Sequence, residues 1–155
     1  MKNAIIFDFN RTLYNPDIEA LMPNAVKVLL ALKQAGYKMF LIGKGTTERV
    51  TLIHDLGLEQ FFEEIIVKDE KDLQDFIRLK NAYSDHEFYS VGDRIKKEIK
   101  FSNQAGCKTI WFKNGKFALE EPTATEENPW KTITKLEELL TIIPLKPGKK
   151  PPKVL

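Results

Sequence analysis

Five charged side chains in this sequence of 155 residues could together bind a divalent metal ion and an anion. Asp8 and Asp93 each stand at the end of a short apolar segment, and Lys44, Lys68 and Lys71 follow two further apolar segments. Carboxylate oxygens are the ligands that Mg²⁺ prefers in proteins, and lysine ammonium groups attract anions. These residue types, in these positions, are typical of a site for a metal ion and an anion.

The apolar segments that precede these residues are rich in Ile, Val, Phe and Tyr, which favours largely buried strands. There are five of them: 4–7 (AIIF), 38–42 (KMFLI), 63–67 (EEIIV), 87–91 (EFYSV) and 108–112 (KTIWF). A further segment, 130–133 (WKTI), could add a short edge strand.

Segments with helical spacing of apolar residues lie between the strands. The first ends at Gly36, which suits a helix stop. The others are expected at 46–57, around 73–77, at 94–105 and, behind a capping box of Thr134 and Glu137, through about 143.

Strands that alternate with helices predict an α/β fold, a three-layer, doubly wound, Rossmann-like domain. Its sheet should be mostly parallel, with five core strands and helices on both faces. In such sheets, functional groups gather outside the carboxyl ends of the strands, which is where the five charged residues fall. We expect one domain over residues 1–143 and a flexible Pro/Lys-rich tail at 144–155.

The composition argues against several classes of protein. Hydrophobic residues make up 43% and charged residues 30%, with a formal net charge of +2, which is too small to indicate nucleic-acid or membrane binding. No apolar run approaches the roughly 20 residues that span a bilayer, and no signal segment opens the chain. A cytoplasmic protein, monomeric or weakly dimeric, is therefore expected.

Several other residues are expected to be structural. Cys107 is the one cysteine, so it is interpreted as a buried thiol rather than half of an internal disulfide. His54 and His86 should lie on the surface, away from the site. Trp111 and Phe112 should belong to the core. The segment 95–100 (IKKEIK) is expected to be mainly a solvated helix face.

Two motifs make the chain resemble the haloacid dehalogenase (HAD) superfamily of aspartate-nucleophile hydrolases and phosphotransferases, over residues 3–143. The family's first motif, D-x-D-x-T after an apolar strand, is matched by IIFDFNRTL, with Asp8 and Thr12 in the first and last positions. The fourth motif, G-D-x-x-x-x-D, is matched by VGDRIKKE, with Asp93 and Glu98 as its acids. The resemblance implies the strand order 5-4-1-2-3 for the core strands.

The resemblance also implies roles for these residues. Asp8 would be the nucleophile that attacks phosphorus and forms an aspartyl-phosphate. Mg²⁺ would be held by Asp8, the main-chain carbonyl of Asn10, Asp93 and Glu98, the last through water. Lys71, with Lys68 as the alternative, would stabilise the phosphoryl charge. Thr12 would belong to the substrate-binding part of the site, together with Arg11, Gly43 and Lys44.

The chain departs from the family pattern at two positions. Asn10 replaces the acid that protonates the leaving oxygen and deprotonates the attacking water, help that is typically worth about 10² to 10⁴ in rate. Lys44 or Glu98 could supply that proton, whereas Arg11 could only clamp an anionic substrate. Gly43 stands where the second motif has Ser or Thr, and backbone amides of 43–47 (GKGTT) could replace the missing hydroxyl.

The spacing of the motifs bears on the substrate. About 30 residues separate Thr12 from Gly43, and about as many separate Gly43 from Lys71, which leaves no room for the full cap domains of many relatives. Resemblance to capless members implies an open site for a phosphorylated substrate, including a macromolecular one, or a site closed by a partner chain. The segment 14–22 could form only a small flap.

Three functions are compatible with this sequence. The first is a Mg²⁺-dependent phosphatase with weak or narrow activity, since Asn10 cannot carry a proton. The second is a non-catalytic protein that keeps the phosphate and metal site for binding. The third, hydrolytic dehalogenation at carbon, fits a nucleophile without a paired acid, but those relatives have a cap and this chain keeps the metal-ligand positions.

Overall fold

A computed structural model of the protein describes residues 1–145. The strands are β1 (Lys2–Phe7), β2 (Tyr14–Asn15), β3 (Ala20–Leu21), β4 (Lys38–Lys44), β5 (Glu64–Lys68), β6 (His86–Gly92), β7 (Lys108–Phe112) and β8 (Lys131–Ile133). The α-helices are α1 (Ala25–Gln34), α2 (Thr47–Asp55), α3 (Leu73–Ala82), α4 (Lys100–Gln104) and α5 (Leu139–Ile142). Shorter helical turns are η1 (Glu59–Phe61), η2 (Ile95–Ile99), η3 (Gly115–Phe117), η4 (Thr125–Glu127) and η5 (Leu136–Glu138).

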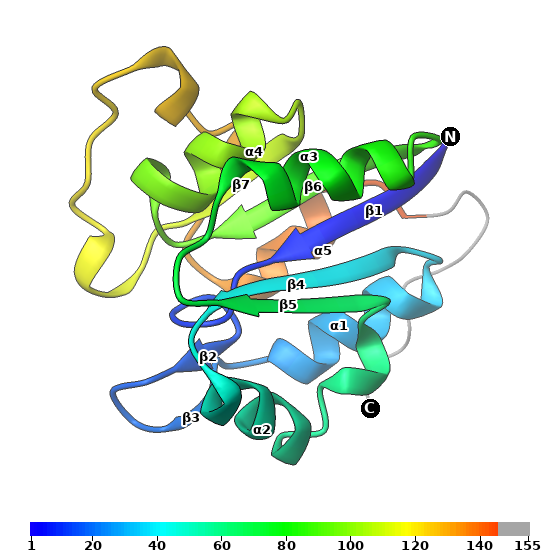
Figure 1. Ribbon diagram of the computed structural model, residues 1–155, viewed down its shortest axis with the longest axis vertical. Coiled ribbons are helices and arrows are strands. Elements are labelled where there is room, and N and C mark those ends of the chain that lie inside the picture. Colours follow the sequence, from blue (N-terminus) through cyan, green and yellow to red (C-terminus); the bar gives the residue numbers. More distant parts are fainter. Residues whose placement is uncertain (146–155) are drawn as a thin grey trace.

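The main sheet has six strands in the order β5-β4-β1-β6-β7-β8, and every pairing within it is parallel. The α/β fold expected from the sequence is therefore confirmed, with the five core strands in the expected order and β8 added at one edge. All the core strands point to the same edge, at the left of Figure 1. The strand order reverses beside β1, because the chain adds β4 and β5 on one side of β1 and then returns to add β6, β7 and β8 on the other side.

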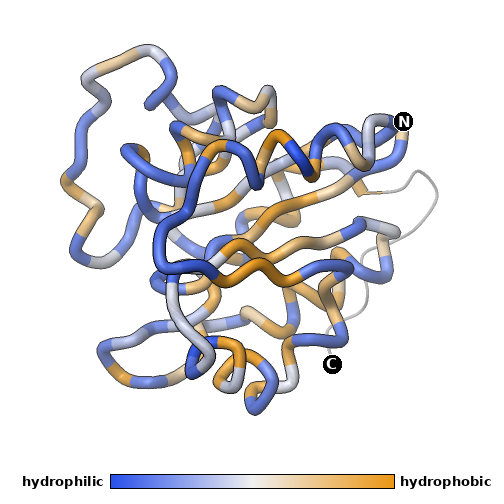
Figure 2. Tube along the Cα trace, viewed as in Figure 1, coloured by the Kyte–Doolittle hydropathy of each residue, from blue (hydrophilic) through white to orange (hydrophobic). Residues whose placement is uncertain are grey.

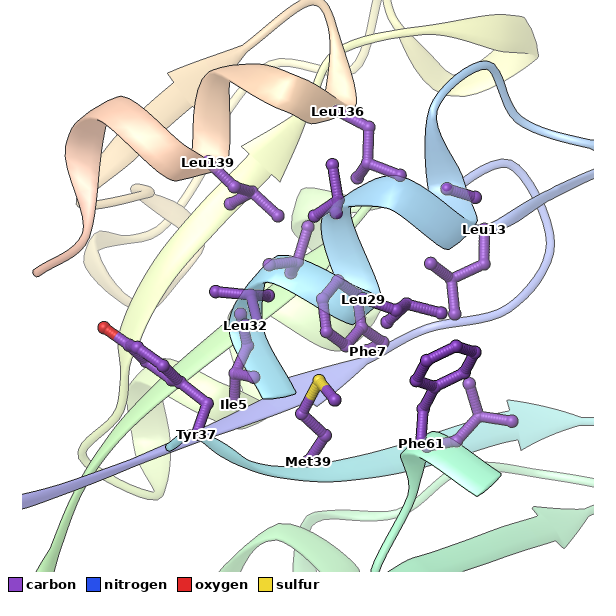
Figure 3. Packing of buried hydrophobic residues seen from close by; sticks show 14 of the residues in the cluster. Ile5, Phe7, Leu13, Leu29, Leu32, Tyr37, Met39, Phe61, Leu136 and Leu139 are labelled. Carbon is purple, nitrogen blue, oxygen red and sulfur yellow. The ribbon is translucent and has the colours of Figure 1, made fainter. Parts of the chain in front are cut away.

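Two cores cover the two faces of the sheet. Because side chains alternate along a strand, Ile5 and Phe7 of β1 face one core, and Ala4 and Ile6 face the other. The first core packs under α1 and α5, as Figure 3 shows for Phe7, Leu29 and Leu139. The second packs under α3 and α4. The strands are accordingly apolar along their length (Figure 2), and they hold the carboxyl edge rigidly.

The helical segment expected at 94–105 is present, but it begins with a π-helical turn, η2, before α4 starts at Lys100. Two other local expectations prove wrong. The capping acid of the last helix is Glu138, not Glu137, because the Glu138 carboxylate accepts the backbone N–H groups of Thr134 and Lys135 at 3.1 and 2.9 Å. His86 is not a surface residue; as the first residue of β6 it shares the inward face with Phe88 and is 8% exposed.

The start of the expected tail is packed. The Tyr37 hydroxyl donates a hydrogen bond to the Pro144 carbonyl, and Leu145 lies against the first core. The rest of the expected tail, 146–155, lies outside the described residues. Among residues 1–145, no helix is both long enough and apolar enough to cross a bilayer.

Candidate active site

A tight turn after β1 brings Asp8 to the carboxyl edge. The Asp8 N–H donates to the Val91 carbonyl at 3.0 Å, so Asp8 still pairs with the end of β6. The Phe9 carbonyl then accepts the N–H groups of Leu13 and Tyr14 at 2.9 and 3.0 Å, which reverses the chain. Asp8 is left 6% exposed, with its carboxylate in a pocket at the edge of the sheet.

Asp93 and Glu98 reach the same place from the end of β6 and from η2. The Trp111 indole N–H donates to the Asp93 main-chain carbonyl at 2.8 Å, and the Ile99 N–H donates to the Arg94 carbonyl at 3.3 Å in the i→i+5 pattern of a π turn. A side chain at Gly92 would bring its Cβ to 2.8 Å from the Cβ of Glu98. A glycine is therefore required for Glu98 to fold back over the strand end.

Three carboxylates and one lysine form the centre of the site. Oxygens of Asp8, Asp93 and Glu98 lie within 4.8 Å of one another, and all three residues are buried. The Lys71 Nζ donates to Glu98 at 2.6 Å and also to Asp8. Buried, clustered carboxylate oxygens are a ligand set that suits a hard divalent cation such as Mg²⁺.

The electrostatics of this cluster point to an excess of negative charge. Burial and the neighbouring Asp8 raise the pKa of Asp93 to about 9. Burial and Asp8 also raise the pKa of Glu98, against the opposing effect of Lys71. Burial works against the charge on Lys71, but the carboxylates of Asp8 and Glu98 outweigh it and raise its pKa. A bound divalent cation would offset the negative charge that Lys71 and Arg11 leave uncompensated.

The structure separates the two lysines that the sequence left open. Lys71 has a side chain that is 7% exposed and contacts Asp8, whereas the Lys68 ammonium lies 3.0 Å from Asp75 and 3.4 Å from Asp72. Lys68 therefore belongs to an ion pair at the start of α3 and does not reach the carboxylates. Lys44 lies at the mouth of the pocket, with its ammonium 3.6 Å from Glu70.

Three other expected site residues have distinct positions. Thr12 is fully buried and its hydroxyl donates to Asp8 at 3.3 Å, so it orients the carboxylate from behind. Gly43 is the penultimate residue of β4, beside Val67, and does not line the pocket. Asn10 lines the pocket, and its side-chain oxygen is buried without a hydrogen-bond partner among the described residues.

Arg11 lies above the carboxylates in a left-handed backbone conformation, with φ 59°. Its Nε donates to Asp93 at 3.2 Å, and its guanidinium lies 5.1 Å from the centre of the Phe117 ring. The Asn114 side chain donates to the Arg11 carbonyl at 2.8 Å. The turn after β1 is thus tied to the loop after β7, which projects at the same edge of the sheet in Figure 1.

The pocket over the carboxylates has a volume of about 240 Å³. Its lining includes residues that were not expected in the site: Glu70, Arg94, Lys97, Lys116 and Phe117. The segment 95–100 is therefore not simply a solvated face, since Lys97 lines the pocket and Glu98 is buried. Lys116 and Phe117 follow the fifth core strand, so the carboxyl-end rule could have indicated them.

Comparison with known proteins gives matches to both sequence and fold. A family model described as HAD-hydrolase-like matches residues 65–139, a range that contains Lys71, Asp93 and Glu98. A glyceraldehyde 3-phosphate phosphatase from Pyrococcus furiosus is 32% identical over 130 residues, which is 79% of this chain and 54% of the relative. The chain therefore spans about half the length of this relative.

Two solved structures illustrate the shared fold. A HAD hydrolase from Bacillus subtilis with bound magnesium has a TM-score of 0.73 at 17% identity, covering 91% of this chain and 98% of that chain. D,D-heptose 1,7-bisphosphate phosphatase from B. bronchiseptica, in complex with magnesium and phosphate, has a TM-score of 0.68 at 19% identity, covering 91% and 99%. At these identities the likeness concerns the fold.

Proposed function

The chain belongs to the HAD superfamily, and we propose that it is a magnesium-dependent phosphatase with Asp8 as its nucleophile. The observation that carries this proposal is the contact of one buried lysine, Lys71, with both Asp8 and Glu98 beside Asp93. Such a cluster pairs a nucleophile with groups that can bind a cation and stabilise a phosphoryl group.

In the proposed reaction, a carboxylate oxygen of Asp8 attacks phosphorus, and the bond from phosphorus to the leaving oxygen breaks. Thr12 holds the Asp8 carboxylate in position, and Lys71 offsets charge on the phosphoryl oxygens. Asp8, Asp93, Glu98 and the main-chain carbonyl of Asn10 would hold Mg²⁺, which would screen the repulsion between nucleophile and phosphate. Water then cleaves the aspartyl-phosphate and releases inorganic phosphate.

Asn10 limits this reaction because its amide cannot donate a proton to the leaving oxygen or take one from water. Alkyl phosphates, whose leaving groups need a proton, should be the poorest substrates. Acyl and aryl phosphates should react faster in the first step. The activity is therefore proposed to be weak or restricted to substrates with good leaving groups.

The substrate is proposed to be a phosphorylated molecule that enters an open pocket. Among the described residues, the segment between β1 and α1 holds only the β2–β3 hairpin, and the segment between β4 and β5 holds α2 and η1. This supports a single domain over residues 1–143 without a full cap, open enough for a macromolecular substrate. The relative from Pyrococcus furiosus is named for a small phosphorylated sugar, which supports the small-molecule alternative.

The experiment that tests the proposal is the hydrolysis of acetyl phosphate and p-nitrophenyl phosphate by wild type and Asp8→Asn, with Mg²⁺ and with EDTA. We expect turnover that requires both Mg²⁺ and Asp8.

Asn10 and Gly43 favour a second function, a non-catalytic phosphate-binding protein. Mg²⁺-dependent phosphate binding without any turnover would support that function and contradict the first.

A further inference from the structure

Two lysines at the mouth of the pocket have no part in the proposed chemistry. Lys97 comes from η2 and Lys116 from η3, and both side chains are exposed while lining the pocket. They lie on segments that are 19 positions apart in the sequence and meet at the carboxyl edge of the sheet. Their position, outside the buried carboxylates, suits contact with a part of the substrate away from the reacting phosphoryl group.

The other cations of the pocket already have carboxylate partners. Lys71 is paired with Asp8 and Glu98, and Arg11 is paired with Asp93. The Arg94 guanidinium is 3.0 Å from Glu120, and Lys44 is paired with Glu70. Within residues 1–145, by contrast, neither Lys97 nor Lys116 has a carboxylate oxygen within 4.0 Å.

Phe117 lies beside two cations at the mouth of the pocket, Arg94 and Lys116. Its ring centre lies 4.0 Å from the Arg94 guanidinium and 5.1 Å from the Lys116 ammonium. The Asn114 side chain anchors the same loop to the Arg11 carbonyl, and Gly115, with φ 68°, allows a close approach to Arg11. The loop is therefore held over the pocket by specific contacts, and these contacts also position Lys116, which belongs to the loop.

The balance of charge leaves room for a second anion. Six cationic and four carboxylate side chains line the pocket, and Glu120, which is paired with Arg94, is a fifth carboxylate, so the excess is one positive charge. Mg²⁺ and a dianionic phosphoryl group would cancel each other, so the excess remains when the proposed reactants are bound. The Arg94 Nε is also buried without a hydrogen-bond partner in the described part of the chain. An anion at the mouth would use both the charge and the unused donors.

We propose that Lys97 and Lys116 form a subsite for a second anionic group, so that the substrate is a small organic phosphate carrying a further phosphate or carboxylate. This inference rests on the proposed function, because it names the substrate class of the same site. In this proposal, selectivity for the second anionic group lies at the mouth of the pocket, whereas Asp8 reacts with the phosphoryl group below it.

The test measures binding, so that it needs no turnover. Mg²⁺-loaded Asp8→Asn protein is titrated by calorimetry with propane-1,3-diol bisphosphate and with 3-hydroxypropyl phosphate, which differ in the second phosphate. Charge-assisted hydrogen bonds from two lysines should favour the bisphosphate by about 10- to 100-fold. The preference should shrink as the salt concentration rises.

The variants in the same background are Lys97→Gln with Lys116→Gln, and a charge-matched control, Lys27→Gln with Lys135→Gln, whose lysines lie on α1 and before η5. The Lys97/Lys116 double variant should lose the preference for the bisphosphate while keeping its affinity for 3-hydroxypropyl phosphate. The Lys27/Lys135 control should keep both the preference and the affinity. Equal affinity of the parent protein for the two ligands, or a preference that survives in the first pair, would overturn the subsite. Failure of the proposed phosphatase would appear separately, as absent turnover of acetyl phosphate by wild type.

Discussion

The Lys71 ammonium group lies 2.6 Å from the Glu98 carboxylate and also contacts Asp8, so one buried lysine connects the strand end of β1 with the π turn after β6. This contact joins residues 63 and 27 positions apart in the sequence. It distinguishes the lysine that can act on a phosphoryl group from its neighbours on the surface.

The first prediction compares Lys71→Met with Lys68→Met. Loss of a preorganised charged donor typically costs about 10²- to 10³-fold in kcat, so Lys71→Met should lower acetyl phosphate turnover by that amount. Lys68→Met should change it by less than about threefold, since the Lys68 ammonium pairs with Asp72 and Asp75 and does not reach the carboxylates of the site. Circular dichroism would verify that both variants fold. Equal losses in the two variants would contradict the assignment of Lys71.

The second prediction concerns the proton that the leaving oxygen needs, which the Asn10 amide cannot donate. Asn10→Asp should raise the hydrolysis of an alkyl phosphate by about 10² to 10⁴ if a missing general acid limits the reaction. Acetyl phosphate, with its better leaving group, should gain less. Asn10→Ala is the matched control and should bring no gain with either substrate. If Asn10→Asp left the alkyl phosphate rate unchanged, another group would already supply the proton.

The third prediction compares two glycines near the carboxyl ends of β4 and β6, the strands on either side of β1. An added Cβ at Gly43 would lie 3.5 Å from the Phe9 Cβ, an ordinary contact, whereas at Gly92 it would lie 2.8 Å from the Glu98 Cβ. Gly92→Ala should therefore displace Glu98 and weaken Mg²⁺ binding by about tenfold or more, the usual scale for a disturbed ligand environment. Gly43→Ala should leave it unchanged. Calorimetric titration with MgCl₂ would reveal the difference, and similar affinities in both variants would count against the role of Glu98.

The fourth prediction concerns pH. Burial and Asp8 raise the pKa of Asp93 to about 9, above the value of about 3.9 expected in the unfolded chain. Between these values the folded state binds more protons, so this group makes the metal-free protein less stable as pH rises from about 4 to 9. Denaturant unfolding in EDTA should show this decline, and Asp93→Asn should flatten it. Mg²⁺ binding should release protons and strengthen with pH; a metal-free stability that rises over the same window would contradict this account.

The fifth prediction concerns Cys107. Burial raises the pKa of its thiol to about 12, so almost no reactive thiolate exists near neutral pH. Ellman's reagent should react with Cys107 only in denaturant, and a Cys107→Ser variant should give no signal in either condition. Fast labelling of the folded protein would show that the strand β7 opens readily at its start.

Much of the fold can be predicted from the sequence because its signals are local. Apolar segments that alternate with segments of helical periodicity indicate the parallel sheet. Functional groups gather at the carboxyl ends of such strands, which places Asp8 and Asp93 at the same edge of the sheet. The errors are also local in origin. The apolar pattern starts β6 one residue too late, which leaves His86 in a loop, and the capping acid is misplaced by one residue.

The sequence by itself determined the alternation of strands and helices, the burial of the strand side chains and the two acids at the edge, because these depend on periodicity and on chain connectivity. The order of the core strands was an expectation from the resemblance to the HAD superfamily, and the structure confirms it. Only the tertiary structure decided that Lys71 reaches Asp8 while Lys68 pairs with Asp75, and that Glu98 turns inward over Gly92. It also brought Lys97 and Lys116 to one pocket. Those contacts depend on the direction in which each turn orients its side chains. That direction is set by packing between segments that are distant in the sequence.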